Sequence, residues 1–282
     1  MDFARSLWLR IETLHAVTYF GEETQAAAAD LGVGGFWSGY FGLRAAPLGR
    51  VEPGVVDATF FNFAPSFVRR WVPEVWSVAS PEAFVAARSR AAAATLVRIV
   101  PDLATVAEAV APFLDVAIAN ASAAGRPLFA TNRDLALPED PVAALWQRCT
   151  VLREHRGDGH VAALTAAGID GIEAHVLIAI ELGTDPLDLQ RTRGWTADDW
   201  DAALERLRGR HLVDPDGALT AAGRELRASV EHTTDHLAAL PWHHLDEVER
   251  TRVVELLTPA ATAVSHAGIL RYPNPIGLPP LP

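Results

Sequence analysis

Three side chains near the start of the chain have the types and spacing of a proton-transfer site. His15, Tyr19 and Glu22 fall within about two turns of a predicted helix. An imidazole and a carboxylate on neighbouring turns could move a proton to and from a bound molecule. We therefore assign catalytic roles to His15 and Glu22 and a ligand contact to Tyr19, as a hypothesis for acid–base chemistry without a cofactor.

A second group has the character of a ligand-binding wall. Trp37, Tyr40 and Arg44 recur at i, i+3 and i+7 and so share one helix face, and Asn62 follows within an aromatic run. Aromatic surface with a few polar groups is typical of a small-molecule pocket, and the planar guanidinium of Arg44 could anchor a carboxylate or phosphate. The same spacing is also typical of a hydrophobic core, and an ion pair with a nearby glutamate would explain Arg44 as well.

The proline-rich segment 272–280 adds one more candidate. Proline fixes the backbone and removes hydrogen-bond donors, so this segment is too stiff and too apolar for a flexible end. We expect it to pack back onto the body, and Asn274, held between two prolines, joins the predicted ligand-binding residues. Whether the segment closes a pocket or covers a seam between helices stays open.

Metal and cofactor chemistry finds little support. His232 and His236 lie one helical turn apart, so both rings could meet one metal ion, but a solvated helix face accounts for them too. The chain contains no lysine, which excludes a lysine Schiff base and the phosphate-binding loop of P-loop proteins. We therefore predict neither a metal nor a cofactor.

Charge and composition restrict the partners. A formal charge of -11 argues against a protein that coats nucleic acid, because that affinity comes from many basic contacts to phosphate. No apolar run approaches the roughly 20 residues of a membrane-spanning helix, so we expect a cytoplasmic protein without a membrane partner. The only cysteine, Cys149, excludes an internal disulfide.

Helices must position these residues, because the apolar spacing is helical almost throughout. Ser80 and Asp185 each precede a proline, an arrangement typical of helix starts. Breaks rich in Gly, Pro or Asp are predicted at residues 45–53, 125–141, 156–159 and 240–246. Only residues 213–219 indicate strands, so the predicted fold class is all-α with a minimal β-wing.

The break at residues 125–141 divides the chain. We predict an N-terminal helical domain with an aromatic pocket at residues 1–140, a linking helix and helix-turn-helix at 141–240, and a C-terminal helix with a tail packing back at 241–282. Helices are expected at residues 172–182, 185–192 and 196–210. The helix from Thr220 and the last helix, residues 248–267, are the expected contacts of a homodimer.

The segment 211–224 resembles the MarR pattern, in which a short strand, a hairpin and a Leu-Thr-x-x-Gly sequence lead into the dimer helix. Here that sequence is Leu219-Thr220-Ala221-Ala222-Gly223, and Thr220 is a sensible helix cap. Pro215-Asp216-Gly217 is a hairpin signal before it. The resemblance implies a winged helix-turn-helix.

Segments 39–41, 44–49, 193–196, 230–235 and 272–278 carry a second likeness, across the whole chain. They make it similar to a family of actinobacterial helix-turn-helix proteins, some of which are encoded near natural-product genes. The resemblance implies an architecture and a small-molecule context, and it brings no established reaction.

The predicted DNA-facing surfaces are acidic. In a winged helix-turn-helix the second helix of the motif enters the major groove with its first residues. Here that helix opens with Asp198, Asp199 and Asp201, and the predicted wing carries Asp214 and Asp216. Carboxylates at both places would repel phosphate, so DNA is a possible but disfavoured partner.

One main hypothesis and two alternatives follow. The main hypothesis is a small-molecule-binding winged-helix protein of natural-product metabolism whose helix-turn-helix binds DNA weakly or not at all. The first alternative is a ligand-responsive MarR-like transcriptional regulator. The second is a cofactor-independent acid–base enzyme.

Overall fold

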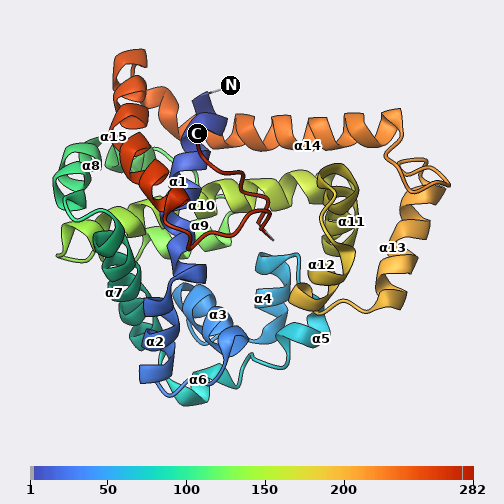
Figure 1. Cartoon of the computed structure of the whole chain (residues 1–282), viewed down its shortest axis with the longest axis horizontal. Coiled ribbons are helices and arrows are strands. Elements are labelled where there is room, and N and C mark those ends of the chain that lie inside the picture. The colour runs from blue at the N-terminus through green and yellow to red at the C-terminus, as the bar shows by residue number, and fades with distance from the viewer. Residues whose placement is uncertain (1–2, 275) are drawn as a thin grey trace.

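The chain folds into helices joined by short loops, as expected from its apolar spacing (Figure 1). The computed structural model describes residues 3–274 and 276–282, so Met1, Asp2 and Pro275 of the tail lie outside it. The helices are α1 (Phe3–Phe20), α2 (Glu22–Asp30), α3 (Phe36–Ala45), η1 (Ala46–Leu48), α4 (Pro53–Phe60), α5 (Pro65–Val68), α6 (Val75–Val78), α7 (Pro81–Ile99), α8 (Leu103–Ala119), α9 (Pro127–Arg133), α10 (Pro141–Ala166), α11 (Gly171–Leu182), α12 (Pro186–Arg193), α13 (Ala197–Gly209), α14 (Ala221–Ala239), η2 (Leu240–His244) and α15 (Glu247–His266).

Side-chain caps start many of these helices where the sequence places them. The Ser80 hydroxyl accepts the N–H of Ala83, and the Asp185 carboxylate accepts that of Leu187. Such caps stabilise a helix by about 1 kcal/mol because they satisfy an N–H that the first turn leaves free. Reciprocal capping boxes open three further helices, at Asp170, Thr196 and Asp246.

The long helix α10 is the centre of the main hydrophobic core. Trp146 and Leu145 are almost fully buried there, and α10 packs against α1, α7, α8, α9 and α14. The predicted break at residues 156–159 is wrong, because α10 continues through both glycines. At Gly159 a Cβ would lie 2.6 Å from the Arg126 guanidinium, so this glycine makes room for a neighbouring side chain.

The helix-turn-helix consists of α12 and α13, with α11 packed beside them. Gly194 ends α12 in the left-handed conformation, with φ 77°, and begins the turn. This turn lies against the α4–α5 segment, since Ala64 donates its N–H to the Arg193 carbonyl at 2.9 Å and the Trp195 indole donates to the Asn62 carbonyl at 3.0 Å. The motif therefore contacts the N-terminal helices, and it shares a hydrophobic cluster with α10, α11 and α14.

The predicted β-wing is not formed, so the fold class is all-α without a winged helix. Over the described residues the only strand-like pairing is a single antiparallel bridge between Val213 and Leu219. Few residues of the connection are left for strands, because Leu212 still donates its N–H to the Leu207 carbonyl at the end of α13 and Thr220 already caps α14. The hairpin residues form a tight turn in which Asp214 donates its N–H to the Ala218 carbonyl.

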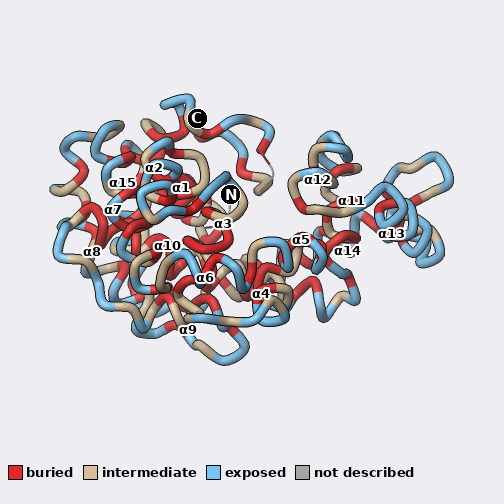
Figure 2. The backbone as a smooth tube through the Cα atoms, turned by 90° about the horizontal axis from the view of Figure 1, so that it is seen from below, coloured by how far each residue is buried: buried red, intermediate tan, exposed pale blue. Residues whose placement is uncertain are grey.

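Buried residues lie where the helices pack together and exposed residues lie on the outside (Figure 2), and most of the buried residues are apolar. The C-terminal tail lies along the main core, where Leu278 and Leu281 are buried. Within the described part of the chain no single helix is both long and apolar enough to cross a membrane; one bent pair, α10 with α11, meets those criteria jointly.

Candidate functional site

Two adjoining cavities lie beside α1, α3 and α10. The larger, of about 540 Å³, runs between these helices, α4, and the helix-turn-helix side of the molecule formed by α11, α12 and α14; we call it the outer cleft. The smaller, of about 200 Å³, lies among α1, α2, α3, α7 and α10; we call it the inner chamber. Both are lined by Tyr19, Phe36, Tyr40, Arg44 and Glu154.

Aromatic rings form one wall of the outer cleft. The ring centroid of Tyr40 lies 5.5 Å from those of both Tyr19 and Trp37 and 5.6 Å from that of Phe63. The guanidinium carbon of Arg44 lies 4.1 Å from the Phe60 ring centroid, a cation–π contact. The wall thus offers flat apolar surface beside a held positive charge.

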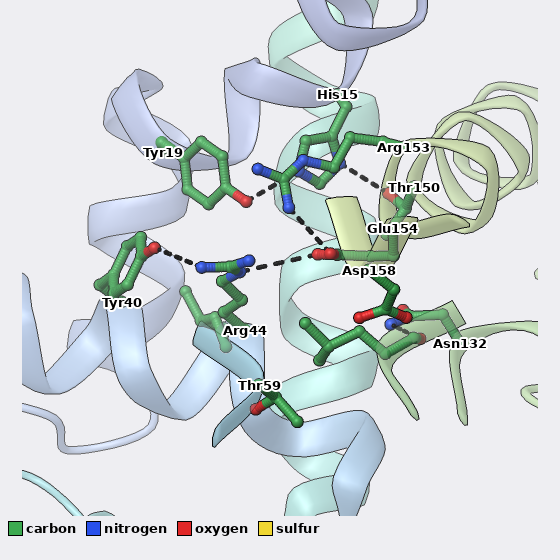
Figure 3. A network of polar contacts seen from close by, with 12 residues as sticks. His15, Tyr19, Tyr40, Arg44, Thr59, Asn132, Thr150, Arg153, Glu154 and Asp158 are labelled. Carbon is green, nitrogen blue, oxygen red and sulfur yellow. Dashed lines mark hydrogen bonds and ion pairs between the residues drawn. The ribbon is translucent and has the colours of Figure 1, made fainter. Parts of the chain in front are cut away.

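Charged groups at the two cavities form one network of polar contacts (Figure 3). Arg44 donates to the Tyr40 hydroxyl at 2.9 Å and lies 3.6 Å from Glu154, which also accepts a hydrogen bond from Arg153 at 2.8 Å. Burial acts to raise the pKa of Glu154, but Arg153 and Arg44 outweigh it and hold that pKa below its ordinary value. Glu154 is therefore ionised at neutral pH.

His15 has a fixed hydrogen-bond pattern. The Thr150 hydroxyl already donates to the Trp146 carbonyl, so it accepts from His15 Nδ1 at 2.9 Å, and Nε2 in turn accepts from the Tyr19 hydroxyl at 2.9 Å. Burial, and then the nearby arginines, lower the pKa of His15 well below its ordinary value. The ring is neutral and holds Tyr19 in place.

The structure brings together most of the residues that the sequence analysis selects. Tyr19, Tyr40 and Arg44 line both cavities, Trp37 and Asn62 line the outer cleft, and His15 lines the inner chamber.

Two other candidates lie elsewhere. The Glu22 side chain is 83% exposed, is 3.8 Å from Arg98 and lines neither cavity, so it is not paired with His15. The Asn274 amide bonds with the backbone of Leu278, although its neighbours Ile276 and Gly277 reach the outer cleft. Catalysis by His15 with Glu22 and ligand contact by Asn274 remain predictions.

Sequence reasoning missed the charged residues that come from distant helices. Glu154 and Arg153 on α10 and Arg193 on α12 all line the outer cleft. The sequence did contain one signal for these residues, because each interrupts an otherwise apolar helix face. A charged residue on such a face is rarely buried without a partner, so the pattern predicts a buried ion pair or a polar site. In all, six arginines and four glutamates line this cleft, so it is positive within a chain of formal charge -11.

The exposed face of the helix-turn-helix is acidic, as expected. Asp198, Asp199 and Asp201 are all exposed on the first turns of α13. The arginines that follow are engaged within the protein: Arg206 binds Glu173 at 2.9 Å and Arg208 binds Glu205 at 2.7 Å. Phosphate approaching this surface would meet carboxylates first.

Among residues 3–274 and 276–282 no three His, Cys, Asp or Glu side chains are placed to hold one metal ion, and His232 and His236 are both exposed. The predicted absence of a metal stays a prediction.

Comparison with known proteins is informative at the level of the family. No curated protein and no solved structure matches the chain. The sequence model of the helix-turn-helix family matches residues 4–271, which is nearly the whole chain and includes the helices of both cavities. The chain therefore belongs to this helix-turn-helix family.

Proposed function

We propose that this protein binds a flat organic anion in the outer cleft and that its helix-turn-helix serves as one wall of the site. The observation that carries this proposal is the lining of the cleft. Aromatic residues of α3 and α4 line a single cavity together with arginines from α3, α10, α12 and α14. Its volume of about 540 Å³ falls within the range usual for small-molecule sites, about 300–1,000 Å³.

Arg44 supplies the anchor for the negative charge. It is oriented by its hydrogen bond to Tyr40 and by the ion pair between its Nε and Glu154, and it stacks on Phe60. A guanidinium held in this way needs little reordering to bind a carboxylate, sulfonate or phosphate.

Helix α12 of the helix-turn-helix and the adjacent helix α11 both contribute groups to the same cleft. His175 of α11 is 4% exposed, and its Nε2 has no hydrogen-bond partner within the described part of the chain. Burial lowers the pKa of His175 to about 3, so the ring is neutral and suited to a polar group of the ligand. A ligand in the cleft would thus contact both halves of the molecule.

A dye titration tests the proposal. 1-Anilinonaphthalene-8-sulfonate is a flat aromatic anion that fluoresces in apolar sites, and we expect one molecule to bind with a dissociation constant on the order of micromolar. Ala174→Trp, which fills the outer cleft, should abolish the signal. Ala202→Trp, on the exposed face of α13, is the matched control and should leave it unchanged. Equal binding by both variants would refute the proposed site.

Membership of the helix-turn-helix family supports a second candidate, a ligand-responsive transcriptional regulator. In that case an occupant of the cleft would act on DNA binding through α11, α12 and α14. Fluorescence anisotropy with genomic fragments at two salt concentrations decides between the candidates. A regulator should bind at least one fragment tightly with a steep salt dependence, whereas our proposal predicts weak binding to all fragments.

A further inference from the structure

The inner chamber contains a buried arginine whose hydrogen bonds all go to neutral groups. Arg88 on α7 is 4% exposed and donates to the Leu43 carbonyl, the Asn132 side chain and the Gln147 side chain. No carboxylate lies within ion-pair distance of Arg88 among the residues that the structure describes. Burial lowers the pKa of Arg88 to about 10, so it still carries its charge at neutral pH.

Further polar atoms of the chamber lack hydrogen-bond partners. Within the described ranges these are Arg88 Nε and the hydroxyl oxygen of Thr24, a residue that is only 5% exposed. Both residues line the inner chamber. Buried polar groups are nearly always hydrogen-bonded in native proteins, so such a concentration at one cavity indicates a ligand with acceptor atoms.

The charge balance and size of the chamber restrict that ligand. Arg88 and Arg44 carry two positive charges and Glu154 one negative charge, while His15 is neutral, so one negative charge would balance the chamber. A cavity of roughly 150 Å³ accommodates benzene, so a chamber of about 200 Å³ has room for a single ring with a small substituent. Ala28, Val33, Leu43 and Trp146 provide apolar contacts for it.

We propose that the inner chamber is a binding site for a small monocarboxylic acid of single-ring size, with its carboxylate held by Arg88 and Arg44 and assisted by the Thr24 hydroxyl. The inner chamber adjoins the outer cleft and shares Arg44 with it, whereas Arg88 and Thr24 line the chamber alone, so the proposal does not require the cleft to be occupied.

Isothermal titration calorimetry with benzoate and its neutral analogue benzamide tests the class of ligand. We expect benzoate to bind once per chain and at least about tenfold more tightly than benzamide, since only benzoate supplies the negative charge. Equal affinities, or no benzoate binding up to about 10 mM, would overturn the proposal.

A matched pair of filling substitutions tests the location. Ala28→Leu enlarges a wall residue of the inner chamber, and Ala174→Leu makes the same change in the outer cleft. Benzoate binding should be lost with Ala28→Leu and kept with Ala174→Leu. If benzoate binding is instead kept with Ala28→Leu and lost with Ala174→Leu, the acid binds in the outer cleft. That result would overturn the inner site and leave the proposed function of the outer cleft intact.

The dye should give the opposite pattern, with binding kept in Ala28→Leu and reduced in Ala174→Leu.

A third pair tests the polar contact without disturbing the arginines. Thr24→Val keeps the shape and removes the unpartnered hydroxyl, and we expect benzoate to bind about tenfold more weakly. In the control Thr59→Val the hydroxyl already donates to the Val55 carbonyl, so affinity for benzoate should stay the same. An unchanged affinity in Thr24→Val would overturn the role of Thr24.

Discussion

Gly194 lies directly against Phe67, so close that a Cβ on this glycine would sit 2.3 Å from the Phe67 Cβ. Gly194 is the turn of the helix-turn-helix, and the Phe67 ring lies 5.2 Å from that of Trp37 in the wall of the outer cleft. The turn and the cleft wall are therefore in continuous contact. A ligand that displaces Trp37 would therefore also displace Phe67 and the turn at Gly194.

Substitution at this contact should loosen the motif from the body. We expect Gly194→Ala to cost about 3 kcal/mol or more in unfolding free energy, through both left-handed strain and overpacking. Gly183→Ala is the matched control, since Gly183 has φ 64° with no atom within 4 Å of the added carbon, and it should cost only about 1–2 kcal/mol. Urea unfolding measures both, and equal costs would mean that the turn is not tightly packed.

Removal of the anchor should weaken anion binding selectively. Arg44→Met deletes a charged partner of the ligand, and we expect dye affinity to fall by roughly tenfold or more. Arg5→Met is the control, because Arg5 at the same cleft already binds Glu231 and Asp235 and should change affinity by no more than about twofold. Similar losses in the two variants would show that the ligand responds to general charge and not to Arg44.

Acid should destabilise the protein before its carboxylates titrate. Burial lowers the pKa of His155 and His175 to about 3 and that of His160 to about 4. As the pH falls, these histidines therefore bind protons in the unfolded chain before they do so in the folded protein. Their contribution to the unfolding free energy is complete above about pH 6.5 and is lost as the pH falls towards their pKa values in the folded protein. Asp158, whose pKa burial raises to about 7, acts in the opposite direction but is a single group.

Urea unfolding at pH 7.5 and pH 5.5 measures this effect. Each buried histidine should lower the unfolding free energy by about 1.4 kcal/mol between these two pH values, and His175→Gln should reduce the slope of stability against pH. His232→Gln, at an exposed position, serves as the control and should leave the slope unchanged. A stability that is flat or increases on acidification would contradict the burial of these rings.

Reversing charge on α13 should create the DNA affinity that the natural surface opposes. The double variant Asp198→Lys with Asp201→Lys should raise affinity for mixed-sequence duplex by about tenfold at low salt. Asp102→Lys with Glu108→Lys changes the net charge equally at the N-cap and first turns of the distant helix α8 and is the control (Figure 1). An equal gain in both would mean that net charge governs binding and that α13 is not the DNA-facing element.

Local signals predicted the helices well and the long-range contacts poorly. Ser80 and Thr196 begin helices because caps act within one turn, which a sequence shows directly. Gly159 is misleading in the sequence because its small size makes room for Arg126 from another segment. The predicted β-wing is wrong because the end of α13 and the cap of α14 leave only residues 213–219 between them.

The site shows the same division. Tyr40 and Arg44 share a helix face and were found together, whereas Glu154 and Arg88 reach the cavities from helices far along the chain. The local sequence of α7 or α10 does not predict which residues their charged side chains contact, because those contacts depend on how the helices pack. Glu22 illustrates the converse, since it is near His15 in sequence but turned to solvent.

Native mass spectrometry tests the central claim most directly. The wild-type protein, Ala174→Trp and Ala202→Trp would each be incubated with the same low-molecular-mass cell extract, measured intact and then unfolded to release any bound molecule. We predict an aromatic anion bound to the wild-type protein and to Ala202→Trp and absent from Ala174→Trp. No bound molecule on the wild-type protein, or the same molecule bound equally to Ala174→Trp, would contradict ligand binding in the outer cleft.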